Sequence, residues 1–154
     1  MNAGTRFGAA VLCALTLLMP DTAAVAAAQN PPPDPVAALL HNLDAAMNAH
    51  DRAAFAALFN VGQATIVQGY LADLFIPGAT HSIIRERDRT PLEAVPAGQG
   101  YRVVVEFFVE TTGRAKILTA SLDVKRPADG DIDSWRIVAA EGLTSVEGLY
   151  KLRL

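Results

Sequence analysis

The chain has 154 residues, with 13 basic and 16 acidic side chains, so its formal net charge is −3. This length favours a single domain. So weak a negative charge argues against nucleic acid or anionic lipid as a partner attracted by the overall electrostatic field of the protein.

Residues 1–28 have the pattern of a secretory signal peptide. Arg6 precedes an apolar run at 7–19, and small residues follow the run, as expected for an exported chain with an A-x-A cleavage site. The run is shorter than the roughly 20 residues that a membrane-spanning helix needs. Cys13 is the only cysteine and lies within the run, directly after Leu12. A lipoprotein signal has a small residue before its cysteine, so Cys13 does not fit one. We expect a periplasmic or secreted protein that has no membrane association after cleavage.

The exported chain, about 125 residues long, is large enough for one hydrophobic core. A proline-rich leader at 29–34 precedes the domain, which we expect over 35–154. Asp34 suits the N-cap of a first helix, and Pro35 suits its first position. The following apolar residues recur at helical spacing and predict one buried face. They are Val36, Leu39, Leu40, Leu43 and Met47.

A polar link at 48–51 joins this helix to the next one without glycine or proline. Asn48 suits a left-handed C-cap, because Asn tolerates a positive φ better than most residues. Asp51 suits the N-cap of a second helix at 52–59. The link is therefore expected to end one helix and to start another at an angle.

A third helical pattern covers 64–75, although the β-branched residues at 65–67 leave a strand as an alternative. From Thr80 onward the apolar residues alternate with period two, which predicts strands. In the strand expected at 134–141, the side chains of Trp135, Ile137 and Ala139 are expected to share a face. The strands are expected at 81–89, 101–111, 115–125, 134–141 and 149–154.

The register of the central hairpin can be worked out from its turn. A two-residue turn at 112–113 pairs Thr111 with Arg114 and fixes every pair beyond them. One face of the hairpin is then apolar except for one lysine near the turn, and the other face is mixed. The mixed face has Arg102 opposite Asp123, which is a favourable cross-strand pair. A slip of one residue would disrupt both patterns.

Two stretches carry a resemblance to a known family. NLDAAMNAHDRAAFAALF at 42–59 resembles the opening of NTF2-like (SnoaL-like) domains, and SWRIVAAE at 134–141 resembles a late strand of the same family. The resemblance implies an α+β cone in which three N-terminal helices pack on a curved antiparallel sheet, with a pocket at the open end. The family includes enzymes and non-enzymes, so the fold does not fix the function.

The resemblance supplies no catalytic residue. Dehydratase and isomerase members of the family place an aspartate or a histidine in the pocket, and no position of this sequence matches those residues. The longer stretch at 134–152 also resembles non-catalytic regions at the front of secreted bacterial peptidases. The chain as an accessory domain of a secreted hydrolase system is therefore an alternative.

The apolar face of the hairpin is expected to face the helices and to line a pocket for a small apolar ligand, or else to fill a closed core. No metal-ligand spacing of histidines occurs, and no cofactor is indicated. The sequence therefore favours a protein without catalytic activity. The enzymatic alternative is a small hydratase or isomerase that uses His81 or Tyr70 as its acid–base group. The pocket candidates are Tyr70, His81, Val105, Phe107, Leu118 and Trp135.

The mixed face is the second candidate site. Val104, Phe108 and Ile117 are apolar residues among polar ones, which is typical of a contact between proteins. We expect a homodimer through this sheet face, as is common in the family that the chain resembles. Arg85, Arg87 and Arg89 are expected on one side of the strand at 81–89, where they either bind an anion or protect an exposed edge. The sequence thus predicts a small-molecule-binding or protein-interaction module.

Overall fold

The computed structural model describes residues 34–128 and 134–145, which all belong to one compact unit. The expected signal peptide at 1–28, most of the leader at 29–34 and the expected strand at 149–154 lie outside these residues. The described part is an α+β fold in which three α-helices and a short 3₁₀ helix precede an antiparallel sheet.

The helical predictions are confirmed, with small differences at the ends. Helix α1 spans Pro35–Asn48, and Asp34 caps it by accepting a hydrogen bond from the Val36 amide at 3.0 Å. Helix α2 spans Arg52–Ala57. A 3₁₀ turn, η1, spans Val61–Gln63 and leads directly into helix α3, Ala64–Leu74. The strand alternative at 65–67 is therefore wrong.

The link between α1 and α2 differs from the prediction in one residue. Asn48 is still helical, Ala49 is the C-cap, and His50 has the positive φ, at 54°. The His50 amide donates to the Met47 carbonyl, and the Asp51 amide donates to the Ala46 carbonyl at 2.9 Å, which is a Schellman ending. Asp51 also caps α2 by accepting from the Ala54 amide at 2.9 Å, as predicted. Asn48 is thus free of the capping role, and its carboxamide bonds to the sheet instead.

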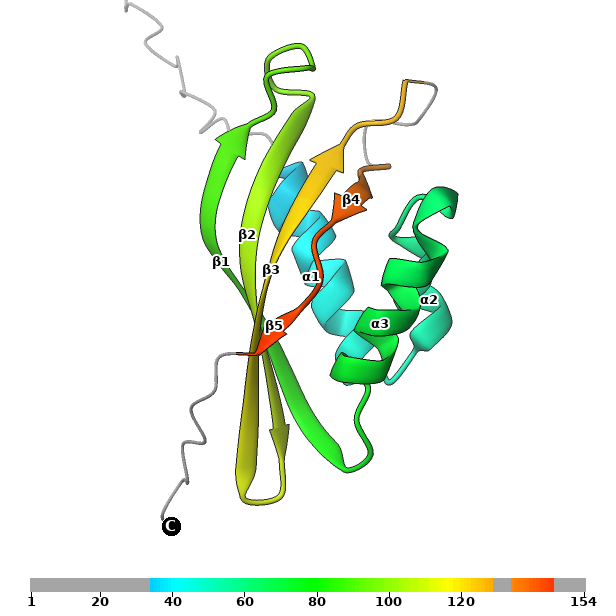
Figure 1. The fold of residues 1–154 in the computed structure, drawn as a ribbon, viewed down its shortest axis with the longest axis vertical. Helices are drawn as coiled ribbons and strands as arrows, with labels where there is room; N and C mark the ends of the chain where they lie inside the picture. Colours follow the sequence, from blue (N-terminus) through cyan, green and yellow to red (C-terminus); the bar gives the residue numbers. More distant parts are fainter. Residues whose placement is uncertain (1–33, 129–133, 146–154) are drawn as a thin grey trace, which may run out of the picture. The chain divides into compact units, whose positions relative to one another are not determined.

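In the described part of the chain five strands form the sheet, in the order β1-β2-β3-β4, and β5 pairs with the lower half of β3 (Figure 1). Their bounds are β1 Ala79–Pro91, β2 Gly100–Thr111, β3 Arg114–Lys125, β4 Arg136–Ala140 and β5 Thr144–Ser145.

The predicted register of the β2–β3 hairpin is confirmed at every pair, from Thr111 opposite Arg114 outward. Gly113 has φ 77° in the turn, a conformation that favours glycine. Arg102 donates to both carboxylate oxygens of Asp123, at 2.7 and 2.9 Å. On the other face of the hairpin, Lys116 donates to the carboxylate and the carbonyl oxygen of Asp73 in α3, at 3.1 and 3.3 Å.

Beyond two β-bulges, residues lie on the opposite face of the sheet from the face that the period-two alternation predicts. A register shift between Glu86 and Asp88 turns the rest of β1 over, so Arg89 pairs with Val103 and lies on the helix side of the sheet. The expected row of three arginines is therefore wrong. A second shift, in the β3–β4 pairing, leaves Ala139 opposite Asp123 and exposed. Each extra residue reverses the alternation beyond it.

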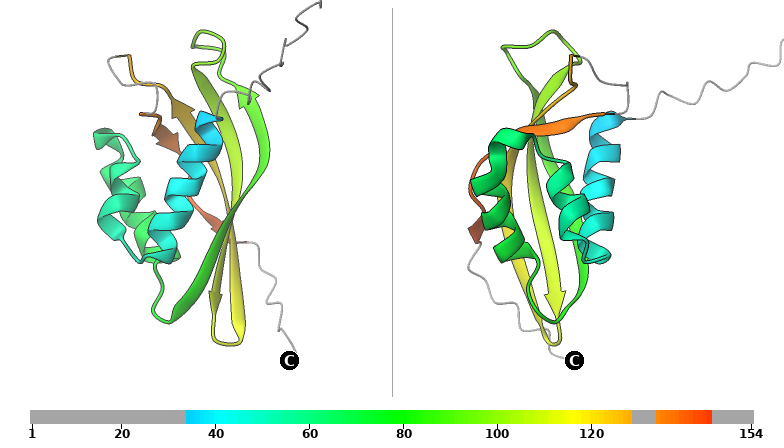
Figure 2. Two further views of the ribbon diagram at one scale, coloured as in Figure 1. Left: turned by 180° about the vertical axis from the view of Figure 1, so that it is seen from behind. Right: turned by 90° about the vertical axis from the view of Figure 1, so that its right-hand side faces the viewer.

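The three helices cover one face of the sheet, which we call the inner face, and leave the other, the outer face, uncovered by any described element (Figure 2). The core lies between the helices and the inner face. The largest of its side chains that are less than 2% exposed are Tyr70, Phe55, Phe107, Leu43, Leu74, Leu118, Leu122, Ile137, Val36, Val103, Val105 and Val109.

Candidate functional site

The predicted pocket residues of the inner face lie in the core. Their exposed fractions are 4% or less for Tyr70, Val105, Phe107, Leu118 and Trp135. The Tyr70 ring makes edge contacts with Phe59 and Phe107, with centroids 5.7 and 6.0 Å apart. Such packing supports the closed-core interpretation of these residues over the pocket interpretation.

The Tyr70 hydroxyl is committed to a structural bond. It donates to the Glu141 carbonyl oxygen at 2.6 Å and so joins α3 to the chain after β4. Burial, followed by the nearby Glu141 charge, raises the pKa of Tyr70 above its usual value of 10.0. A phenol that is buried, hydrogen-bonded and harder to ionise is a poor general base near neutral pH.

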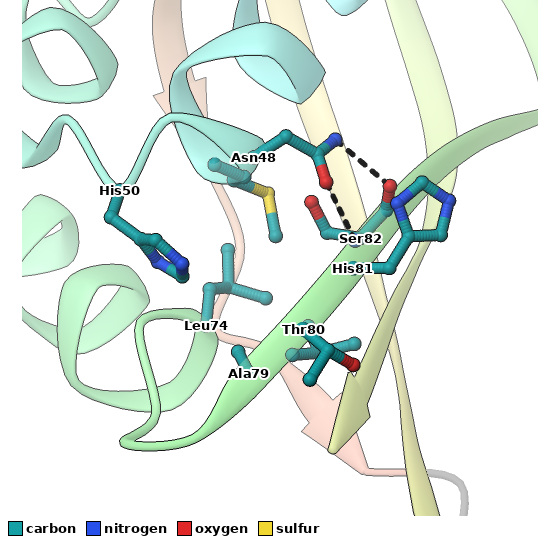
Figure 3. Close-up of a pocket in the computed structure, with 9 residues that line it drawn as sticks. Asn48, His50, Leu74, Ala79, Thr80, His81 and Ser82 are labelled. Atoms are coloured by element: carbon teal, nitrogen blue, oxygen red, sulfur yellow. Dashed lines mark hydrogen bonds between the residues drawn. The ribbon is translucent and has the colours of Figure 1, made fainter. Parts of the chain in front are cut away.

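His81 borders a small cavity of about 10 Å³ between the end of α1, the end of α3 and the start of β1 (Figure 3). This volume accommodates roughly one water molecule. The His81 side chain is exposed, and in Figure 3 it lies on the opposite side of β1 from His50. The cavity is thus too small for an organic substrate, and the two histidines do not converge on it.

In the same region, the polar C-terminal end of α1 forms hydrogen bonds with β1. Asn48 Oδ1 accepts from the Ser82 amide at 2.9 Å, and Asn48 Nδ2 donates to the Ser82 carbonyl at 3.0 Å. One turn earlier, Asp44 lies against the Ile84 amide. Burial raises the pKa of Asp44, while His81, the Ile84 amide and His41 oppose the rise in that order. Helix α1 therefore presents polar side chains to the free edge of β1.

At the other end of α1, Arg89 ties the helix to the sheet. It donates two hydrogen bonds to Asp34, at 2.9 and 2.8 Å, and two to Glu86, both at 2.7 Å. The hydrogen bond from Arg89 is the largest cause of a lowered pKa of Asp34. The Arg89 guanidinium also lies 5.7 Å from the centre of the Tyr101 ring, which stacks on Trp135. Four of its five N–H donors are used within the fold, so this arginine has little capacity left to bind an anion.

The outer face carries the exposed apolar residues. Ile83 and Phe108 are the large hydrophobic residues that remain exposed in the described part of the chain, at 49% and 38%. Ile83 is the direct partner of Phe108, and Phe108 is the direct partner of Ile117. We call this set of three the outer apolar row. Val104, the other predicted interface residue, is half-buried and lies four residues before Phe108 on the same face.

Sequence reasoning found two members of the outer apolar row and missed Ile83. The β2–β3 turn fixed the register that joins Phe108 to Ile117, but no short turn connects β1 to β2. A loop between Pro91 and Gly100 separates the two strands, so their register could not be worked out from loop length. The one available signal was the apolar Ile83 at period two with Arg85 and Arg87.

A trough of about 620 Å³ lies further along the outer face, next to the Arg102–Asp123 pair. Its walls come from the start of the β1–β2 loop, including Leu92 and Glu93, and from Lys125. Arg102 uses two of its nitrogens on Asp123, and the trough is open to solvent. It therefore offers charges of both signs but no enclosed binding volume.

Within residues 34–128 and 134–145, no group of three or more His, Cys, Asp or Glu side chains is arranged to hold a metal ion. None of the helices in this part of the chain is long and apolar enough to cross a membrane. Comparison with protein-family models, curated proteins and solved structures finds no match to this chain. The class that the fold defines is thus an α+β domain whose helices cover one face of an antiparallel sheet.

Proposed function

We propose that this chain is an exported α+β domain of the NTF2-like type that acts as a protein-interaction module and self-associates through its outer sheet face. The observation that carries the proposal is the outer apolar row, Ile83, Phe108 and Ile117, on a face that no described element covers. Burial of apolar surface contributes about 25 cal/mol per Å² to association, less the entropic cost of bringing two molecules together.

The charges beside the row favour a second copy as the partner. Arg85 and Arg87 lie on one side of the row, and Glu110 lies on the other. A two-fold axis along the row exchanges the two sides, so the arginines of one copy approach Glu110 of the other. Glu106 also approaches that Glu110, and its ion pair with Arg87 at 3.5 Å offsets the repulsion.

The interior offers less support for a ligand or a reaction. Its predicted pocket residues are packed in the core, and Tyr70 is committed to the Glu141 carbonyl. His81 borders a cavity of about 10 Å³. We therefore favour the interaction module over the hydratase or isomerase alternative.

The export half of the proposal rests on the sequence pattern of residues 1–28. The intact mass of exported protein tests it, because a chain cleaved after the small residues should begin near Gln29. Recovery of a form that retains Met1, or of one with lipid on Cys13, would contradict it.

A charge in the centre of the row tests the interface. Phe108→Lys places two ammonium groups beside each other across a two-fold contact, where they are poorly solvated. The wild type should sediment as a dimer and Phe108→Lys as a folded monomer. Thr112→Lys is the matched control, because it adds the same charge in the exposed turn of the same hairpin, and it should remain a dimer.

Two results would contradict self-association through this face. One is a Phe108→Lys protein that keeps the wild-type mass. The other is a wild type that is already monomeric, which would make a different protein the expected occupant of the outer apolar row and favour the accessory-domain alternative.

A further inference from the structure

The first strand of the sheet has a free edge. β1 ends the strand order, and only β2 pairs with it among the described strands. The backbone groups on the free side of such a strand form a template onto which another chain can add. At 13 residues β1 is long for an edge strand.

Asn48 occupies the pairing position at one point on this edge. Its carboxamide accepts from the Ser82 amide at 2.9 Å and donates to the Ser82 carbonyl at 3.0 Å (Figure 3). A neighbouring antiparallel strand offers the same acceptor and donor to a residue in a hydrogen-bonded pair. A further bond from Asn48 Nδ2 to the Asp44 carbonyl, at 3.0 Å, fixes the carboxamide to the helix.

The contact extends to the next residue that faces the edge. Every second residue of an antiparallel strand presents its amide and carbonyl to the same side, so Ile84 follows Ser82. The Ile84 amide lies against the Asp44 carboxylate. Asp44 and Asn48 are one helical turn apart, so α1 holds a polar side chain beside each of two successive edge-facing residues of β1, and the hydrogen bonds to the edge are those of Asn48.

The other half of β1 is protected by its own charges. Residues 85–89 alternate in sign. In antiparallel pairing of two β1 strands centred on Arg87, Arg85 lies opposite Arg89 and Glu86 lies opposite Asp88. Like charges directly opposite each other destabilise a strand pair, and the bulge near Arg87 distorts the edge further.

The half near Ser82 lacks such opposed charges, and its own register shift, between Ala79 and His81, lies at the start of the strand. Pairing of two β1 strands centred on Ser82 places His81 opposite Ile83 and Thr80 opposite Ile84, and Arg85 meets Ala79. No like charges oppose each other in this arrangement. We propose that Asn48 prevents the β1 strand of a second copy from adding to the β1 edge at Ser82, so that α1 keeps a continuous two-molecule sheet from forming.

The test replaces Asn48 in two backgrounds. Asn48→Ala should add a concentration-dependent species of twice the parent's mass in sedimentation equilibrium, both in the wild type and in Phe108→Lys. The second background lacks the proposed outer-face contact, so the edge effect is measured apart from that proposal. Asn42→Ala, an exposed asparagine on the same helix, is the matched control and should keep the parent's mass.

Hydrogen exchange at the Ser82 amide reports the edge directly. In Asn48→Ala this amide should exchange faster than in the parent at low concentration, and it should regain protection as the concentration rises. If Asn48→Ala does not fold, Asn48→Ser takes its place, because its side chain is too short to reach both backbone groups of Ser82. A folded variant with the parent's mass at all concentrations, and with Ser82 exchange that does not depend on concentration, would overturn the inference.

Discussion

Arg89 on β1 donates to both carboxylate oxygens of Asp34, the residue that caps α1, at 2.9 and 2.8 Å. The contact joins the beginning of the first helix to the far end of the first strand. It exists because the bulge near Arg87 turns Arg89 toward the helices.

Removal of this contact should destabilise the fold. Arg89→Met keeps the apolar stem over Tyr101 but leaves Asp34 and Glu86 without their donor. We expect a loss of about 1–2 kcal/mol in urea unfolding at neutral pH, because charged hydrogen bonds that are partly exposed are worth about that much. Arg114→Met, which alters an exposed arginine at the hairpin turn, is the control and should cost much less.

The same pair predicts an acid-dependent change. The pKa of Asp34 is below its ordinary value of 3.8 in the folded state, so its stabilising contribution is complete above 3.8 and is lost as the pH falls through the folded-state pKa. The stability difference between wild type and Arg89→Met should therefore shrink in acid. A difference that stays constant or widens below 3.8 would show that Arg89 does not act through Asp34.

Asp44 should behave in the opposite sense. Its pKa is raised by burial, so the folded state disfavours its charged form, and stability is lost as the pH rises through the folded-state pKa. Asp44→Asn removes the charge and keeps the size and shape of the side chain. It should stabilise the protein by less than about 1 kcal/mol at neutral pH, since Asp44 is partly exposed. Thermal melts at two pH values check this, and a variant that is less stable than wild type only at neutral pH would contradict it.

Adjacent phenylalanines separate the two faces of the sheet. Phe107 is fully buried and Phe108 is 38% exposed. Phe107→Ala should cost about 3–5 kcal/mol in urea melts, because it leaves a cavity in the core. Phe108→Ala should cost much less when the protein is dilute enough to be monomeric. Equal losses at that dilution would show that both side chains are structural and would remove the main support for a docking face.

Tyr70→Phe tests whether the phenol is structural. The variant keeps the ring contacts with Phe59 and Phe107 but leaves the Glu141 carbonyl without its donor. We expect a loss of about 1–2 kcal/mol in unfolding free energy. An unchanged stability would mean that the hydroxyl is dispensable for the fold and would reopen a role for it in chemistry.

Local signals in the sequence were enough for most of the fold. The spacing from Val36 to Met47 predicted α1, and the turn at Gly113 predicted every pair of the β2–β3 hairpin. Both signals act over a few residues, so neighbouring residues determine the outcome. The bulge near Arg87 and the exposed Ala139 could not be predicted, because a bulge depends on how distant strands pack and leaves no mark in the alternation.

The candidate sites were harder to predict for the same reason. Burial of Tyr70 and Phe107 followed from the face assignments, but whether the space between them was filled depended on how α3 and Phe59 pack. The role of Asn48 was missed, since a polar residue at a helix end suggests a cap, and its actual partner, Ser82, lies 34 residues away in the chain.

The mass of the unaltered protein in solution tests the central claim most directly. Sedimentation equilibrium over a concentration series should give twice the mass of one chain, because the outer apolar row is expected to be buried against a second copy. A mass of one chain at every concentration, up to the high micromolar range, would contradict self-association through the outer face.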